Sequence, residues 1–146
     1  MKKLILFLAF LIISSISFSQ EINMINNSTN DVKKYITETY GNIDPISQNY
    51  SDQLVYIYIT DDAQKISFYF TNNKCTFQRI DYPSVKDGEN LVIKLDKILK
   101  RKVINIDVPD EYVWIQEIDD KSYEWSLKIK SNGASLVIRR NYTSLK

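Results

Sequence analysis

Hydrophobic residues recur along the chain with two different periods. Helical spacing of apolar residues over 29–40 predicts a first helix, in which Ser28 and Asp31 have capping-box spacing and Gly41 suits the C-terminal end. A second apolar stripe predicts a helix that begins after Ser84 or Asp87. The members of this stripe are Leu91, Leu95, Ile98 and Leu99. We therefore expect one helix near the start of each half of the chain.

Six stretches alternate between apolar and polar residues, as strands do when one face is buried. They are residues 53–60, 65–71, 75–81, 111–118, 123–130 and 135–142. Short polar sequences that favour turns separate them, namely Asp61-Asp62, Asn72-Asn73, Asp119-Asp120 and Asn132-Gly133. The predicted order is thus αβββ in 28–83 and again in 84–146. An internal duplication and an independent recurrence of this unit both remain open.

Three strands joined by short turns form an antiparallel meander, and an amphipathic helix covers one face of such a layer. The prediction is therefore a single α+β domain over 28–146. It consists of an antiparallel six-stranded sheet, built from two αβββ units, with two helices on one face. The second face of the sheet is expected to remain open.

The open face is predicted from strand parity, because side chains two positions apart share a face. Three strands are expected to turn apolar residues to the helices: Val55, Ile57 and Ile59; Ile66, Phe68 and Phe70; Trp125, Leu127 and Ile129. The open face then carries five aromatic residues: Tyr56, Tyr58, Tyr69, Tyr112 and Trp114. In 111–118 the opposite parity also remains open, because Val113 and Ile115 compete for the core. Tyr and Trp provide large, rigid contact areas, so we interpret this face as a binding surface. The alternative is that the tyrosines only stabilise cross-strand pairs.

The first residues have the pattern of a secretory signal. Lys2 and Lys3 precede the apolar run 4–13, and serines follow it. Ser17 and Ser19 fit the small-residue positions before a cleavage site, so we expect residues 1–19 to be removed and 20–27 to form a flexible arm. As a helix, the apolar run would reach about 15 Å, short of a hydrocarbon core of about 30 Å. The predicted product is exported, periplasmic or extracellular, and free of the membrane after cleavage.

The composition argues against several classes of function. Among 146 residues there are 19 Lys and Arg, 18 Asp and Glu, one Cys and no His. Catalytic units and metal sites built on His, or on two Cys, are therefore excluded. The near balance of charge argues against general capture of nucleic acid. We expect neither a cofactor nor a metal, because no phosphate-binding loop or dinucleotide fingerprint occurs.

Other candidate residues have simple structural interpretations. Cys75 lies in an alternating run and is expected to be a small buried apolar residue. The acidic pairs at the strand ends are read as turns rather than as calcium ligands, because the acidic ladder of a calcium loop is missing. Five basic residues are expected to form a solvated face and to complement the dipole of the second helix: Lys94, Lys97, Lys100, Arg101 and Lys102.

These observations favour an exported, non-catalytic binding or interaction domain of the inhibitor or accessory type. It is expected to bind another protein or a small ligand through the aromatic sheet face. One alternative is a hydrolase of envelope or extracellular polymer, which predicts two carboxylates converging in one pocket, one of them with a raised pKa. A further alternative is a carrier of small hydrophobic ligands, which predicts an enclosed cavity of a few hundred Å³.

Overall fold

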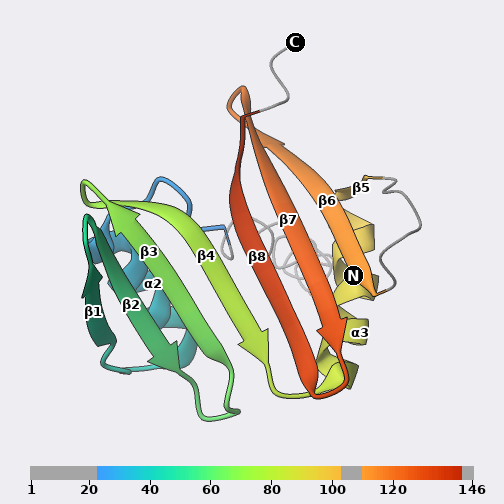
Figure 1. Ribbon diagram of the computed structural model, residues 1–146, viewed down its shortest axis with the longest axis horizontal. Helices are drawn as coiled ribbons and strands as arrows, with labels where there is room; N and C mark the ends of the chain where they lie inside the picture. Colours follow the sequence, from blue (N-terminus) through green and yellow to red (C-terminus); the bar gives the residue numbers. More distant parts are fainter. Residues whose placement is uncertain (1–22, 103–109, 143–146) are drawn as a thin grey trace, which may run out of the picture.

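A computed structural model describes residues 23–102 and 110–142 (Figure 1). In this part of the chain, eight strands form one antiparallel sheet in the order β1-β2-β3-β4-β8-β7-β6-β5. The strands are β1 (Ile46–Tyr50), β2 (Gln53–Ile59), β3 (Lys65–Thr71), β4 (Lys74–Tyr82), β5 (Lys100–Arg101), β6 (Glu111–Ile118), β7 (Lys121–Lys130) and β8 (Gly133–Asn141). The helices are α2 (Thr29–Tyr40) and α3 (Val85–Ile98).

The prediction of six strands is wrong, because each half contributes a four-stranded meander after its helix. The two additional strands, β1 and β5, lie at the two edges of the sheet. Four of the five residues in β1 are exposed, and β5 has only two residues. An edge strand that buries neither face needs no alternation of apolar residues, so periodicity could not reveal it. The last strands of the halves, β4 and β8, pair at the centre from Phe77↔Arg139 to Tyr82↔Ala134.

The start of each helix follows from its local sequence. Ser28 accepts a hydrogen bond from the backbone N–H of Asp31, and the Asp31 side chain accepts one from the Ser28 backbone N–H. This reciprocal capping box confirms the predicted start of α2. In α3 the cap is Ser84, whose hydroxyl accepts a hydrogen bond from the Asp87 backbone N–H at 3.2 Å. Of the two candidate caps, Ser84 therefore fulfils the role.

Three tight turns follow the polar dipeptides closely. Asn72-Asn73 has φ angles of 51° and 58°, and Asp119-Asp120 has 48° and 59°. Positive φ at both central residues is typical of hairpin turns that match the strand twist, and both predicted turns are confirmed. The turn between β7 and β8 lies one residue earlier than predicted, because Gly133 already pairs with Lys130. Gly133 has φ +147°, and a Cβ there would lie 2.3 Å from the Tyr82 carbonyl oxygen. Only glycine fits this approach.

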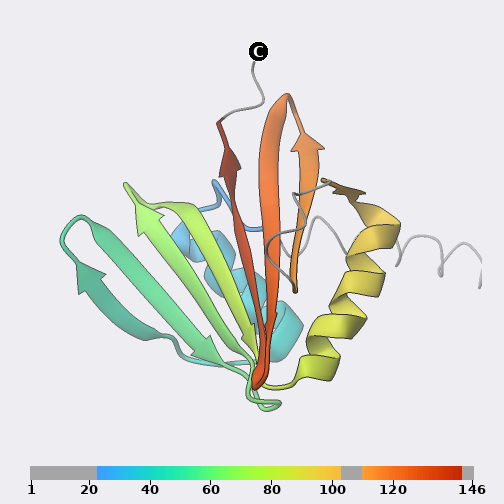
Figure 2. The same ribbon diagram turned by 45° about the vertical axis from the view of Figure 1, so that its right-hand side comes forward.

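Both helices cover the same face of the sheet, as predicted (Figures 1 and 2). They contribute Val32 and Ile36 from α2, and Leu91 and Leu95 from α3, to a single hydrophobic core. No helix among residues 23–102 and 110–142 is long and apolar enough to span a bilayer.

Residues 23–27, assigned to a flexible arm from the sequence, form part of the helix-side layer. Met24 and Ile25 are buried. The backbone N–H of Asn26 donates to the Cys75 carbonyl at 2.8 Å, and the Cys75 N–H donates to the Asn27 carbonyl at 2.9 Å. This pairing occupies the part of β4 that lies beyond its register with β8. The predicted signal peptide, 1–19, and the remainder of the predicted arm lie outside the described residues.

Candidate functional site

The structure separates the five aromatic residues that were expected to share the open face. Directly paired residues of antiparallel strands share a face of the sheet. Tyr56 pairs with Phe68, and Trp114 pairs with Trp125, so all four face the helices. By the same alternation Tyr58 and Tyr112 face the helices too. Of the predicted set, only Tyr69 lies on the open face, and the expected aromatic open surface is wrong.

The parity of β2 was misjudged because both of its faces are apolar. Val55, Ile57 and Ile59 alternate with Tyr56 and Tyr58, so either set suits a core by hydrophobicity alone. In the structure the tyrosine rings, not the aliphatic side chains, pack on the side of α2, where Tyr58 joins Val32 and Ile36 in the core. In β6, Tyr112 and Trp114 face the helices instead of Val113 and Ile115, and Trp114 is fully buried.

Trp114 and Tyr112 belong to a structural cluster that joins α3 to β5 and β6. The Trp114 indole Nε1 donates to the Asp96 carboxylate at 2.9 Å. Arg101 donates to both oxygens of Asp96, at 2.8 and 2.6 Å. Its guanidinium also lies 5.1 Å from the centre of the Tyr112 ring, which is stacked on Trp114. Arg101 is therefore engaged in this cluster rather than part of a purely solvated basic face.

The open face has a mixed character. Two ion pairs lie on it, Arg79 with Asp81 at 2.9 Å and Arg139 with Glu124 at 2.6 Å. Tyr69 meets Phe77 edge to face at 5.1 Å between ring centroids. The exposed large apolar side chains of this face near the β1 edge are Ile46, Tyr50 and Ile59.

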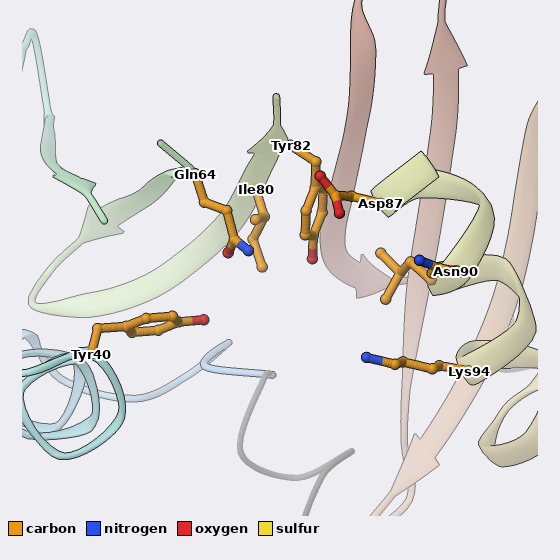
Figure 3. Close-up of a pocket in the computed structure, with 8 residues that line it drawn as sticks. Tyr40, Gln64, Ile80, Tyr82, Asp87, Asn90 and Lys94 are labelled. Atoms are coloured by element: carbon orange, nitrogen blue, oxygen red, sulfur yellow. The ribbon is translucent and has the colours of Figure 1, made fainter. Parts of the chain in front are cut away.

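On the helix side, a cavity of about 210 Å³ lies between the end of α2, the end of β4 and the start of α3 (Figure 3). Its lining is drawn from three elements and one turn. The lining residues are Tyr40, Gln64, Ile80, Tyr82, Asp87, Asn90, Leu91 and Lys94. The cavity thus combines an apolar floor with several polar side-chain ends.

Local structure directs four polar ends into one space. Tyr40 is the last residue of α2, and Tyr82 is the last residue of β4. Lys94 lies on the face of α3 that carries Leu91. Gln64 precedes β3, and its backbone N–H donates to the Thr60 hydroxyl at 3.1 Å. The hydroxyls of Tyr40 and Tyr82, the Gln64 amide and the Lys94 ammonium point toward one another across the cavity (Figure 3).

Burial controls the protonation of the two phenols. Desolvation raises the pKa of Tyr82, and the nearby negative charge of Asp87 acts in the same direction. Desolvation likewise raises the pKa of Tyr40. Both hydroxyls therefore remain protonated at neutral pH, where each can donate a hydrogen bond. Asp87 itself accepts a hydrogen bond from the Ser84 hydroxyl at 2.6 Å.

Among the residues that the structure describes, Asp87 is the only acidic residue that lines the cavity. In the described ranges, no group of three or more His, Cys, Asp or Glu side chains is placed to hold a metal ion. Cys75 is fully buried, as predicted, and burial raises its thiol pKa to about 12. Such a thiol is not a nucleophile at neutral pH.

Sequence reasoning did not find this cavity. Tyr40, Gln64, Tyr82 and Asn90 carried no signal of a shared site. Lys94 was expected on a solvated face, and it is indeed exposed, although it also lines the cavity. The spacing of Asp87, Leu91 and Lys94 does place them along one side of a helix. The partners from α2 and β4 come close only through tertiary packing.

No protein-family model, curated protein or solved structure matches the chain.

Proposed function

We propose that this chain is an exported, non-catalytic binding domain whose small-molecule site is the cavity between α2, β4 and α3. The observation that supports this most is the convergence of the Tyr40, Tyr82 and Lys94 side-chain ends in one cavity. A few convergent polar groups above an apolar floor are typical of ligand sites, because the floor provides affinity and the polar groups fix orientation. Export, to the periplasm or the cell exterior, rests on the leader-like sequence of residues 1–19.

The cavity favours a small polar ligand over the alternatives from the sequence. Its volume, about 210 Å³, is below the roughly 300–1,000 Å³ of pockets for drug-sized ligands. A hydrophobic ligand would desolvate the Tyr82 hydroxyl that lines the cavity without offering it a hydrogen bond, at an energetic cost. A polymer hydrolase would require a second carboxylate beside Asp87.

The site is tested by a small-molecule library and NMR spectra of the purified chain. Ligands of the cavity will shift the backbone signals of the lining residues. Asn90→Trp places a large ring at the cavity from an exposed helical position, and it should abolish these shifts. Ile93→Trp is the matched control, because Ile93 is exposed on α3 and does not line the cavity. The proposed site would be contradicted if no compound in the library shifted the signals of the lining residues. It would also be contradicted if the shifts persisted in Asn90→Trp.

A second candidate function is protein binding through the open face near β1. Ile46 and Ile59 are 51% and 54% exposed there, beside the free edge of the sheet. Exposed apolar side chains next to an unpaired edge favour an extended partner segment. Replacement of both isoleucines by Asp should abolish capture of such a partner while the cavity still binds its ligand.

A further inference from the structure

We propose that β1 is a dimerisation edge, which pairs with β1 of a second copy of this chain around a two-fold axis at Gln48. The pairing is antiparallel, the axis is perpendicular to the sheet, and two eight-stranded sheets become one. This inference depends on the second candidate function, since it identifies the extended partner segment as a second copy. It is independent of the cavity, because no residue of β1 lines it.

The two edges of the described sheet differ in their protection against another strand. An edge strand leaves alternate backbone N–H and C=O groups unpaired, and short or charged edge strands discourage other chains from pairing there. β5 has both protections, because it consists only of Lys100 and Arg101. β1, at the left edge of the sheet in Figure 1, has five residues without a charge or a proline, and its register with β2 contains no bulge. β1 is therefore the edge that can accept a further strand.

The side chains of β1 are complementary to themselves when the strand is reversed. Ile46 and Tyr50 are 51% and 57% exposed, and both lie on the open face with Gln48 between them. The Tyr50 hydroxyl donates to the Gln48 side-chain oxygen at 2.6 Å. Antiparallel pairing centred on Gln48 aligns all five residues and places Ile46 of each copy opposite Tyr50 of the other. Such pairs of an aromatic and a β-branched residue stabilise antiparallel strands.

The absence of charge on β1 favours a second copy over a different partner. A two-fold axis brings residues near their own counterparts, so a charged edge strand would repel itself. A partner of different sequence is commonly selected by opposite charges, which β1 does not offer. The charges nearest to β1 in sequence are the exposed Asp44 and Asp52. In the centred register Asp44 of one copy approaches Asp52 of the other, so added salt should strengthen the dimer.

The helix layer leaves room for the second copy. Part of α2 lies over β2, where the Lys33 ammonium is 5.1 Å from the centre of the Tyr56 ring. In the dimer the two β2 strands are three strand spacings apart, about 14 Å. This separation exceeds the roughly 8–10 Å between the axes of packed helices. On the helix side β1 itself carries only Ser47 and Asn49, which are polar and exposed. Both helix layers therefore fit on the same side of the joined sheet.

Sedimentation equilibrium of the purified exported chain tests the pairing. The parent chain should form dimers. Gln48→Lys and Gln48→Glu each place two like charges opposite each other at the axis, and each should weaken the dimer at least about threefold. An equimolar mixture of these two variants should recover the affinity, because the axis then joins a Lys to a Glu. Ile93→Lys is the matched control and should change nothing, since Ile93 is exposed on α3, which packs over β4, β7 and β8.

A fourth variant tests the register from its ends. Asp52→Lys replaces the repulsion from Asp44 of the other copy by an attraction, and it should tighten the dimer about threefold. Added salt should then weaken the dimer of this variant, whereas it strengthens the parent dimer. The same salt response in both chains would contradict the centred register.

The outcomes separate the dimer from the other proposals. A chain that stays monomeric at the concentrations used for NMR would overturn the dimer, and capture of a different protein by such a monomer would retain the second candidate function. A dimer that both Gln48 variants leave unchanged, or that their mixture fails to restore, would also overturn the proposal. Hydrogen exchange provides a second measurement, because the outward amides of β1 should exchange more slowly at high than at low chain concentration. The library experiment judges the cavity independently.

Discussion

Gly88 of α3 lies directly against Ala134 of β8, so closely that a Cβ added to Gly88 would be 2.5 Å from the Ala134 Cβ. A further contact of 3.2 Å would form with Ile129. This approach brings the first turns of α3 onto the centre of the sheet, and those turns form one wall of the cavity.

Gly88→Ala should therefore destabilise the protein. Alanine is a better helix former than glycine by about 1 kcal/mol, but overpacking a close contact typically costs about 1–3 kcal/mol. We expect a lower free energy of unfolding in urea. Combining Gly88→Ala with Ala134→Gly should recover part of the loss, since the second change removes the clashing methyl group. An increase in stability for Gly88→Ala alone would contradict this packing.

Tyr58→Phe should leave stability unchanged or raise it at neutral pH. Tyr58 is 1% exposed and its hydroxyl has no hydrogen-bond partner in the described structure. A buried unsatisfied polar group costs about 1–3 kcal/mol, so removal of the hydroxyl relieves part of that cost. Thermal unfolding of the variant and the parent chain provides the comparison. A marked loss of stability would indicate a hydrogen-bond partner.

The free energy of unfolding should also depend on the ionisation of the Tyr58 hydroxyl at alkaline pH. Burial raises the pKa of Tyr58 to about 12 from the ordinary value of 10.0. The folded state therefore retains a proton that the unfolded state releases, and stability falls as pH rises from about 10 to about 12. Tyr58→Phe should show a shallower decline than the parent chain in urea unfolding over this range. Tyr40 and Tyr82 will contribute to the decline that remains.

Gln116→Leu should destabilise the attachment of the N-terminal segment. The Gln116 side-chain oxygen accepts hydrogen bonds from the Trp125 indole at 3.1 Å and from the Asn23 amide at 2.9 Å. The apolar substitution leaves both buried donors unsatisfied, at about 1–3 kcal/mol each. We expect a lower free energy of unfolding and faster hydrogen exchange at Met24 and its neighbours. Glu117→Gln, the adjacent exposed position, should have little effect, and equal effects of the two changes would contradict the buried network.

Cys75 should be inert in the folded protein. Its side chain is fully buried and its thiol pKa is raised to about 12 by burial, so little thiolate exists at pH 8. Alkylation by iodoacetamide, followed by mass spectrometry, should be slow under native conditions and fast in denaturant. A chain with Thr76→Cys and Cys75→Ser moves the thiol to the neighbouring exposed position and should react rapidly when folded. Rapid alkylation of native Cys75 would contradict its burial.

Features specified by neighbouring residues were predictable. The capping box at Ser28 and Asp31 defines the start of α2, and the dipeptides Asn72-Asn73 and Asp119-Asp120 form the hairpin turns that their types favour. These interactions involve residues only a few positions apart, so the local sequence is enough to predict them. The α+β class and the two helices on one face followed from such local elements combined with hydrophobic periodicity.

The edge strands and the faces of β2 and β6 were not predictable in this way. β1 exists because its backbone pairs with β2, from Ile46↔Ile57 to Tyr50↔Gln53, and its side chains remain largely exposed. In β2 both faces are apolar, so the register against Phe68 and the packing of α2 determined which face is buried. Pairing and packing are relations between segments distant in sequence.

The amino-acid sequence by itself determined the helices, the turns and most of the strands, because hydrogen bonds and hydrophobic alternation within a short segment suffice to specify them. Tertiary structure decided the two edge strands, the burial of Trp114 and the cavity that brings Tyr40, Tyr82 and Lys94 together. The physical reason is that these three side chains belong to α2, β4 and α3, whose spacing depends on how both halves of the chain pack against one sheet.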